Sequence, residues 1–396
     1  MKKMPLLIAA LLFAFSLSAQ EKSTLLLDSA RLSKAKALYQ KRDGDVVALV
    51  KPIVEESNKL LTLVPKSILE KSFTPPSGDK HDYMSMAPYF WPDPTKPDGK
   101  PYIRKDGERN PEINKITDKS NMGTIERACR YLSLAYYFTG DEKYAVKGTQ
   151  LLQFWFIDKA TRMNPNLNYA QAVPGVNDGR GIGIIETVSL TSLTDAIVLL
   201  EGSAALTPAI DQQLRNWFED YRNWMLTSKN GNDEHNALNN HGTWYDMQML
   251  TFSLFLGKKD FAKEYAQKSL LRIPVQIEKD GKQPLELERT TALGYSTFNI
   301  DAWFKVATLA QKAGVDIWNY KTTDGRGIKL ALDWLWPYAV GEKKWEYKQI
   351  HEYKPDGIYF LLMTANAQYP DNGYEAAAIR IKKPSGDPIT NLMSAM

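Results

Sequence analysis

The sequence is poor in the residues that cross-link a chain or bind metals. Its 396 residues include one cysteine, Cys129, and four histidines. A single cysteine excludes an internal disulfide, and the sequence shows no His-Glu-x-x-His or calcium-loop pattern that would indicate a metal site. We therefore expect a fold without disulfides, and an activity that uses no metal and no other cofactor.

The sequence also lacks a large excess of charge of either sign. It has 50 basic and 46 acidic residues, and removal of Lys2 and Lys3 with the N-terminal segment would leave 48 basic residues. So small a net charge argues against nucleic acid as a partner. It still allows a local basic groove for an acidic polysaccharide. We expect a monomer or a weak oligomer.

Long apolar runs are confined to the N-terminus. Met1-Lys2-Lys3 precedes an apolar run from Leu6 to Leu17, and the small residues Ser18-Ala19 follow. This order is typical of a secretory signal peptide, and the run is too short to span a bilayer comfortably. We predict a signal peptide over residues 1–20 and a single domain over residues 21–396. The mature protein is expected to be periplasmic or secreted, without membrane contact.

Strand patterns are weak, whereas apolar residues recur at helical spacing through most of the chain. Helices are predicted over residues 125–138, 142–156, 185–200, 208–225, 234–255, 261–273, 298–313 and 328–337, with a last pair at 345–347 and 358–367. Short polar loops between successive helices are typical of antiparallel hairpins. We predict an all-α fold, an α/α toroid formed as an incomplete barrel of antiparallel helical hairpins with long irregular loops. A superhelical repeat is the alternative, but no fixed-period repeat is present.

Two segments lack helical spacing. Residues 74–112 contain eight prolines, which forbid a helix, together with several aromatic residues. Such a segment is expected to pack over the domain or to form a binding wall. Residues 164–183 are rich in asparagine and glycine and form either a surface loop or the floor of a groove. The side chains offered for substrate binding, by stacking or by polar contacts, are Tyr89, Trp91, Asn168, Gln171, Asn177, Arg180, Trp244 and Tyr245.

Two further stretches carry an unusual combination of reactive side chains. Residues 239–245 read Asn-Asn-His-Gly-Thr-Trp-Tyr, and residues 287–295 read Leu-Glu-Arg-Thr-Thr-Ala-Leu-Gly-Tyr. Cleavage of a uronic-acid polymer by β-elimination must neutralise a carboxylate, remove a carbon-bound proton and protonate a leaving oxygen. Asn240 and Arg289 suit the first task and His241 the second. Tyr295 suits the third and is also a candidate base.

Less specific interpretations of the same residues remain open. A single histidine in a helix is more often structural, and an Arg-x5-Tyr spacing occurs in many helices. A glycoside hydrolase on the same toroid would need two opposed carboxylates, for which Glu186, Glu286 and Glu288 are available. A non-catalytic glycan-binding protein is a second rival, but such surface proteins usually carry a lipid-bearing cysteine after the signal peptide.

Several motifs resemble those of one family. They are Asp-Tyr-Met-Ser-Met-Ala-Pro-Tyr-Phe-Trp-Pro-Asp-Pro at 82–94, Gly-Glu-Arg-Asn-Pro-Glu at 107–112, Asn-Leu-Asn-Tyr-Ala-Gln at 166–171, Asp-Gly-Arg-Gly at 178–181 and Asn-Asn-His at 239–241. Together they resemble the alginate lyase family of polysaccharide lyases over about residues 74–367. The resemblance implies an α/α toroid and metal-independent β-elimination. It places Asn240 and Arg289 on the carboxylate, with His241 and Tyr295 handling protons.

The motifs depart from the mannuronate-specific branch of that family. The spacing from Arg289 to Tyr295 is one residue shorter, and Gly-Thr stands after Asn-His where that branch has Ser-Tyr. The chain is more similar to a broader branch that includes alginate and glucuronan lyases. We therefore expect a lyase that acts on a β-1,4-linked polyuronate. Alginate containing mannuronate is the main candidate and β-1,4-glucuronan the alternative.

Overall fold

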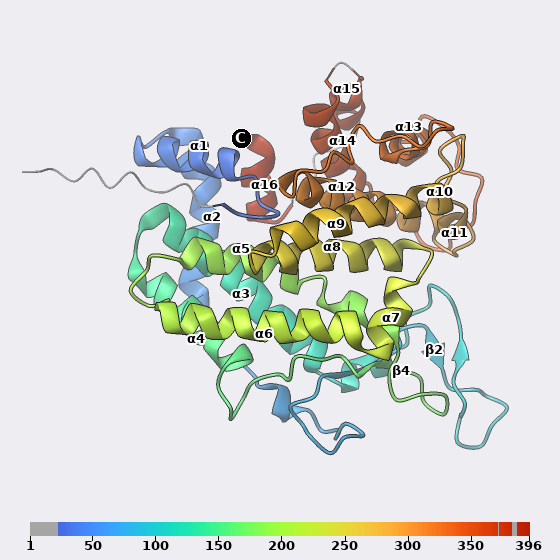
Figure 1. The fold of residues 1–396 in the computed structure, drawn as a ribbon, viewed down its shortest axis with the longest axis horizontal. Coiled ribbons are helices and arrows are strands. Elements are labelled where there is room, and N and C mark those ends of the chain that lie inside the picture. The colour runs from blue at the N-terminus through green and yellow to red at the C-terminus, as the bar shows by residue number, and fades with distance from the viewer. Residues whose placement is uncertain (1–22, 371, 382–385) are drawn as a thin grey trace, which may run out of the picture.

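Helices run through the chain in antiparallel pairs (Figure 1). The computed structural model describes residues 23–370, 372–381 and 386–396, so the predicted signal peptide lies outside the described residues. The longer helices are α1 (Ser29–Gln40), α2 (Gly44–Leu60), α3 (Asp118–Thr139), α4 (Glu142–Phe156), α5 (Leu190–Leu200), α6 (Pro208–Thr227), α7 (Lys229–His235), α8 (Asn240–Phe255), α9 (Lys259–Ser269), α12 (Ala292–Lys312), α13 (Ile328–Ala339), α14 (Asp356–Gln368), α15 (Tyr374–Ile379) and α16 (Pro388–Ala395). Short helical turns are η1 (Ile68–Glu70), η2 (Pro111–Lys115), η3 (Gly181–Thr187), η4 (Leu270–Arg272), α10 (Ile273–Gln276) and α11 (Pro284–Leu287).

The helical pairs pack side by side as an incomplete ring. Helices α3, α5, α8, α12 and α14 contact one another in that order, and α4, α6 and α9 flank them. Their buried apolar side chains form one cluster that extends from Leu25 to Leu392. The predicted α/α toroid is confirmed.

Local sequence explains where these helices begin and end. The Thr207 hydroxyl accepts a hydrogen bond from the Ile210 N–H, and Pro208 occupies the first turn of α6, where its missing N–H costs nothing. Gly140 ends α3 in the left-handed conformation, with φ at 70°. Asp141 then caps α4 through the N–H of Lys143. Gly140 and Asp141 thus produce the tight turn between α3 and α4.

Some predicted helices differ from those observed. The single helix expected over 234–255 is two helices, α7 and α8, separated at residues 236–239. Residues 345–347 are not helical, because their aromatic rings pack against Trp334 as an irregular segment. Helices α1 and α2 were not predicted from the sequence, since α1 shows no regular apolar stripe and α2 contains a proline.

The two irregular segments are joined by short strands. β1 (Met84–Met86) pairs in parallel with β4 (Tyr169–Ala172), and β2 (Phe90–Trp91) pairs with β3 (Ile103–Arg104) in an antiparallel hairpin. Residues 74–112 and 164–183 therefore form one wall at one end of the helical ring (Figure 1).

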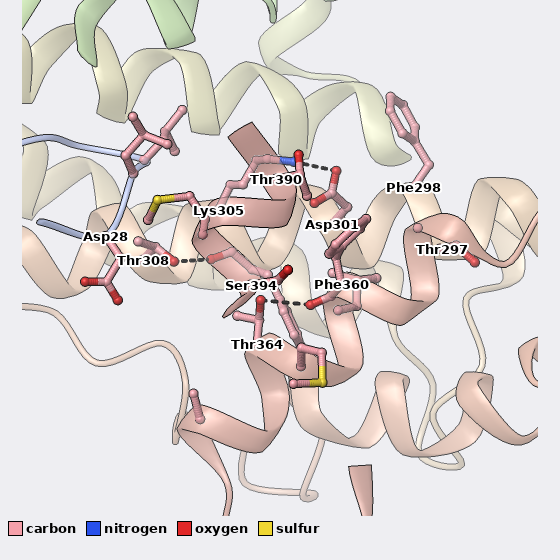
Figure 2. A pocket seen from close by; sticks show the side chains of 18 of the residues that line it. Asp28, Thr297, Phe298, Asp301, Lys305, Thr308, Phe360, Thr364, Thr390 and Ser394 are labelled. Atoms are coloured by element: carbon pink, nitrogen blue, oxygen red, sulfur yellow. Dashed lines mark hydrogen bonds and ion pairs between the residues drawn. The ribbon is translucent and has the colours of Figure 1, made fainter. Parts of the chain in front are cut away.

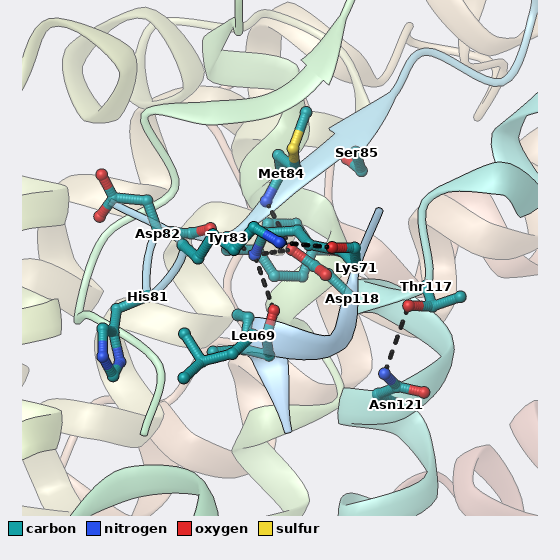
Figure 3. Close-up of polar contacts among 12 residues, drawn as sticks. Leu69, Lys71, His81, Asp82, Tyr83, Met84, Ser85, Thr117, Asp118 and Asn121 are labelled. Atoms are coloured by element: carbon teal, nitrogen blue, oxygen red, sulfur yellow. Dashed lines mark hydrogen bonds and ion pairs between the residues drawn. The ribbon is translucent and has the colours of Figure 1, made fainter. Parts of the chain in front are cut away.

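A buried lysine fixes this wall to the helices (Figure 3). The Lys71 ammonium is fully buried and donates to the carbonyls of Ile68 and Asp82 at 3.0 and 2.8 Å, and to Asp118 Oδ2 at 2.7 Å. Asp118 also accepts from the Met84 N–H at 2.9 Å. Burial lowers the pKa of Lys71, and the adjacent Asp118 carboxylate opposes that effect. One ion pair thus ties η1, β1 and the start of α3 together.

A second apolar stretch was not anticipated from the sequence. Residues Gly181–Leu200 are apolar and long enough to cross a bilayer, but 72% of the apolar window is buried inside the fold. This stretch passes between neighbouring helices, so its hydropathy reflects the protein core.

Candidate active site

Asn240 and His241 occupy the first turn of α8. Helix α7 ends at His235, and α8 begins at Asn240. The Asn239 side chain caps α8 by accepting a hydrogen bond from the His241 N–H at 3.3 Å. A Cβ at Gly242 would lie 2.2 Å from the Ala237 carbonyl oxygen, so the residue after His241 must be glycine for the turn to close. The polar Asn-Asn-His-Gly motif is therefore a helix start in which each residue has a steric or hydrogen-bonding role.

A buried carboxylate orients His241. His241 Nδ1 lies 2.7 Å from Glu234 Oε1, and Glu234 on α7 is only 1% exposed. Because a carboxylate accepts, Nδ1 carries the proton, and Nε2 of the neutral ring is left as the acceptor. The second Glu234 oxygen has no hydrogen-bond partner in the part of the chain that the structure describes. The pair is suited to hold His241 as a base with a defined tautomer.

A second buried carboxylate holds Asn240. Glu286 on α11 accepts the Asn240 backbone N–H and its side-chain Nδ2, both at 2.7 Å. Burial raises the pKa of Glu286, while the two Asn240 hydrogen bonds and the nearby charges of Arg289 and His241 oppose that rise. Glu286 therefore lies near Arg289 as well as the Asn240–His241 pair. The Asn240 side chain donates to Glu286 and is 1% exposed, and its Oδ1 has no hydrogen-bond partner in the part of the chain that the structure describes.

Arg289 and Tyr295 form the second half of the site. The guanidinium of Arg289 lies 3.6 Å from the centre of the Tyr295 ring, and the Tyr295 hydroxyl donates to the Tyr89 hydroxyl at 3.1 Å. Burial and the hydrogen bond to Tyr89 raise the pKa of Tyr295 well above its usual range, although Arg289 opposes them. The phenol is therefore protonated at neutral pH and ready to donate its proton.

Arg289 is also bound to the wall by an aspartate. Asp106 accepts from Arg289 Nη2 at 2.8 Å and Nε at 3.2 Å, and from the Thr290 N–H at 3.2 Å. Burial would raise the pKa of Asp106, but these hydrogen bonds outweigh burial and hold it well below its usual range. Gly107 permits the approach, since a Cβ there would lie 2.5 Å from Thr290 Oγ1. Sequence reasoning missed Asp106, for which the following glycine was the available signal.

Gln171 and Arg180 are hydrogen-bonded to each other beside the β2–β3 hairpin. Gln171 has a left-handed backbone, with φ at 50°, and its carbonyl and side-chain oxygens accept from Arg180 at 3.0 and 3.1 Å. The Arg180 guanidinium lies 5.0 Å from the centre of the Phe90 ring. A strained non-glycine residue that fixes an arginine is typical of a functional site.

Other residues proposed for binding have local structural contacts. Asn168 accepts from the Trp224 indole at 3.0 Å, and the Asn177 side chain accepts the Val173 N–H at 3.1 Å within its own turn. The Trp91 indole donates to the Glu108 carbonyl and stabilises the hairpin. Among the predicted binding residues, Tyr89 contacts a catalytic candidate directly, because its hydroxyl accepts a hydrogen bond from Tyr295.

The expectation that Trp244 and Tyr245 stack on sugar rings is wrong for this structure. Each is 2% exposed. Trp244 packs on Phe298 with ring centres 4.6 Å apart, and the Tyr245 hydroxyl donates to the Met225 carbonyl. Residues three and four positions after His241 turn into the core because α8 is buried on nearly every side.

The carboxylates proposed for a hydrolase are not opposed across a cleft. Glu186 is buried and accepts from Tyr83 and Ser85 at 2.8 and 2.5 Å. Glu286 is committed to Asn240, and Glu288 is exposed. Among residues 23–370, 372–381 and 386–396, no group of three or more His, Cys, Asp or Glu side chains has a metal-binding arrangement.

Comparisons with known proteins identify the family. The model of the family described as alginate lyase matches residues 67–345. An alginate lyase from Bacteroides ovatus is 41% identical, with a TM-score of 0.89 over 94% of this chain and 99% of that one. This chain belongs to the alginate lyase family. It is therefore a polysaccharide lyase, as the sequence motifs indicated.

More distant lyases share the fold. Alginate lyase A1-III from a Sphingomonas species is 16% identical, with a TM-score of 0.58 over 95% of this chain and 99% of that one. A variant of A1-III complexed with a tetrasaccharide is also 16% identical, with a TM-score of 0.61 over 95% of this chain and 98% of that one. None of the curated proteins matches the sequence of this lyase.

Proposed function

We propose that this lyase cleaves a β-1,4-linked polyuronate, mannuronate-containing alginate in particular, by β-elimination. The observation that carries the proposal is the arrangement of two reactive pairs around Glu286: Asn240 with His241, and Arg289 with Tyr295. A relative that is 41% identical is described as an alginate lyase, and a structural neighbour is a complex with a tetrasaccharide. Both support an acidic polysaccharide as the substrate.

The proposed reaction begins at the uronate carboxylate. The proton at C5 becomes acidic only when the carboxylate charge is neutralised, because charge then develops as an enolate. Asn240 supplies a neutral amide donor and Arg289 a guanidinium. The C5–H bond breaks, its electron pair forms the C4–C5 double bond, and the C4–O bond breaks. Tyr295 gives its proton to the leaving oxygen.

Stereochemistry decides which residue removes the C5 proton. In mannuronate the C5 proton and the leaving oxygen share a face, so in a syn elimination Tyr295 can serve both if it starts as the phenolate, which takes the C5 proton and passes it to the leaving oxygen. In guluronate they lie on opposite faces, so an anti elimination requires His241 as base. The hydrogen bond from His241 Nδ1 to Glu234 leaves Nε2 as the nitrogen that can take the C5 proton.

A β-1,4-glucuronan is the second candidate substrate. The shortened spacing between Arg289 and Tyr295 and the Gly-Thr after His241 favour the branch that includes glucuronan lyases. Glucuronate differs from mannuronate at C2 and presents the same relation between the C5 proton and the leaving oxygen. The same residues would therefore perform either reaction.

The direct test is the ultraviolet absorbance of the unsaturated uronate formed at each cut. Purified protein is incubated with polymannuronate, polyguluronate and β-1,4-glucuronan, each with and without a chelator. A rise in absorbance that is insensitive to the chelator supports a metal-independent lyase and identifies its substrate. Release of reducing ends without absorbance on all three polymers would instead indicate hydrolysis and overturn the proposal.

We also propose that the protein acts in the periplasm or outside the cell, as a monomer or weak oligomer. The apolar N-terminal run after Lys2 and Lys3 supports export. Fractionation of cells that express the full-length chain, with sequencing of the mature N-terminus, tests this. Recovery of uncleaved protein in the cytoplasm would contradict it.

A further inference from the structure

A chamber of about 1300 Å³ lies beside the catalytic helix (Figure 2). Its walls are α12, α14, α16 and the chain that leads into α1, and Arg130 of α3 contributes to them. Asn240, His241, Arg289 and Tyr295 are not among its lining residues. It is therefore separate from the site described above, although the two share a helix.

The chamber follows one face of α12 along its whole length. Gly294, Phe298, Asp301, Lys305 and Thr308 line it, and their spacing of three or four residues places them on one face. That face begins at Gly294, the residue before Tyr295. One end of the chamber is thus directly beside the catalytic turn of α12.

The same end of the chamber reaches the segment that holds Arg289. Thr291 and His351 line this end, and His351 Nε2 lies 3.1 Å from the Gly107 carbonyl oxygen. Gly107 follows Asp106, which binds Arg289. This end of the chamber therefore lies next to the segments that carry Arg289 and Tyr295.

The lining combines the side chains that bind acidic sugars. It contains threonine and serine hydroxyls, glutamine amides, the cations Arg31, Arg130, Lys305, Lys312 and Lys354, and three acidic residues, Asp28, Asp301 and Glu352. Most of these cations already have partners: Lys305 pairs with Asp301, Arg31 with Asp28, and Arg130 with Glu126 and Asp387, while Lys312 donates to the Thr24 carbonyl. In the described ranges the Lys354 ammonium has neither an ion pair nor a hydrogen bond. The hydroxyls, the amides and the Lys354 ammonium offer polar contacts to an anionic, hydroxyl-rich ligand, and a lipid chain would leave these contacts unused.

An aromatic ring is exposed inside the chamber. Phe298 is 37% exposed, although α12 is a buried helix and the ring is supported from behind by Trp244. Phe360 of α14 also lines the chamber (Figure 2). Aromatic faces stack against the C–H faces of sugar rings, so these rings offer the apolar part of a sugar-binding surface.

We propose that the chamber binds the part of the polyuronate chain that extends away from the bond being cleaved. This proposal rests on the proposed function, since it gives the chamber the same acidic polysaccharide. It makes the enzyme favour long chains, because each additional uronate that enters the chamber adds contacts with hydroxyls, cations and the Phe298 ring.

The test compares a long and a short substrate. Thr364 of α14 is exposed into the chamber, and Thr364→Trp should fill it, whereas Phe298→Ala should remove the stacking surface. For each variant we expect the ratio of kcat/KM on the polymer to kcat/KM on a trisaccharide to fall about tenfold, the effect of losing about 1.4 kcal/mol of binding. Phe298→Tyr, which keeps the ring, should retain the wild-type ratio.

A matched substitution controls for the added tryptophan. Thr124 of α3 is exposed, bonds to the carbonyl four residues earlier as Thr364 does, and does not line the chamber, so Thr124→Trp should leave the ratio unchanged. An unchanged ratio in both Thr364→Trp and Phe298→Ala would overturn the chamber proposal. Absence of cleavage of the trisaccharide and of every polymer by the wild type would instead overturn the proposed function.

Binding to an inactive protein gives an independent readout. In a Tyr295→Phe background, calorimetry should show weaker binding of a decasaccharide after Thr364→Trp, without a comparable loss for the trisaccharide. Stabilisation of the wild type by a long-chain fatty acid, abolished by Thr364→Trp while decasaccharide binding is retained, would assign the chamber to a lipid and contradict the proposal.

Discussion

The two halves of the site are held in different ways. Asn240 and His241 lie at the start of a buried helix, and their carboxylate partners, Glu234 and Glu286, are each 1% exposed. Arg289 and Tyr295 are held by Asp106 and Tyr89, which come from the proline-rich segment 183 and 206 residues earlier in the chain. One half is built from the helical core, and the other depends on the wall that covers it.

This difference indicates how the tasks are divided. The core half is positioned in advance by hydrogen bonds to two buried carboxylates, which suits a base that must keep one tautomer. In the other half, the partners of the guanidinium and the phenol sit on a partly exposed loop segment. Substrate entry beside that segment would reorganise the Arg289–Tyr295 half more easily than the Asn240–His241 half.

The largest effect is expected from Tyr295→Phe. Loss of the hydroxyl removes the proton donor for the leaving oxygen, so kcat should fall by about 10³-fold, with binding of an oligouronate retained. Rates are measured from the absorbance of the unsaturated product, and the midpoint of thermal unfolding checks the fold. Near-normal turnover would show that Tyr295 is not the acid.

A smaller effect is expected from Glu234→Gln in the core half. Glutamine can donate to Nδ1 as well as accept from it, so His241 no longer has one enforced tautomer, and kcat should fall about 10²-fold. KM should change little, because Glu234 is buried behind His241. The exposed Glu55→Gln on α2 is the control. An equal loss on polymannuronate and polyguluronate would show that His241 matters for both geometries, and no loss on either would exclude it as the base.

The wall half is tested by Asp106→Asn. The neutral amide weakens the ion pair with Arg289, so we expect KM to rise about tenfold with a smaller change in kcat, the loss of roughly 1.4 kcal/mol of binding. Asp98→Asn, in the turn between β2 and β3, is the control: within the described residues the Asp98 side chain is bonded only to the Lys100 N–H, so the variant should behave as the wild type. A fall in kcat with KM unchanged would show that Asp106 serves the chemical step instead.

The same ion pair predicts a resistance to acid. The pKa of Asp106 in the folded protein lies below its usual value. The ion pair with Arg289 is therefore fully formed at any pH above the usual carboxyl range. The ion pair is lost only as the pH falls through the lowered pKa of Asp106. The wild-type KM should therefore stay low in mild acid, and the KM of Asp106→Asn should be raised across the whole range. A wild-type KM that rises to the variant's level in mild acid would contradict this.

Sequence reasoning succeeded where helices and short motifs decide the structure. The helical spacing of 125–138 and the Thr207-Pro208 start are confirmed in α3 and α6. The catalytic candidates were proposed because two amides and a histidine are unusual at a helix start, and the structure places Asn240 and His241 in the first turn of α8. Trp244 and Tyr245 were misassigned because α8 is buried on nearly all sides, so no apolar stripe distinguishes its core face from a binding face.

Contacts between distant segments were beyond the reach of the sequence. Asp106 meets Arg289 only after the proline-rich segment folds back over the helices; Gly107 marks a close approach there, but no local pattern says which residue is approached. Glu234 was hidden for a related reason: the break at 236–239 turns α7 so that this carboxylate faces His241. A continuous helix, as predicted from the spacing, would not have brought the two side chains together in this way.

The smallest expected effect concerns the pH at which Tyr295 loses its proton. Burial and the hydrogen bond to Tyr89 both raise the pKa of Tyr295, so Tyr89→Phe should lower it, by roughly 0.7 pH unit for a hydrogen bond worth about 1 kcal/mol. If Tyr295 acts as the acid in its protonated form, the alkaline fall in kcat/KM should move to lower pH by that amount. If Tyr295 must first lose its proton to act as the base, the variant should instead shift a rise in activity to lower pH. Whether the part of the pH profile that moves is a rise or a fall in activity therefore distinguishes the base role of Tyr295 from its acid role. A profile identical to that of the wild type would show that Tyr89 does not control the pKa of Tyr295.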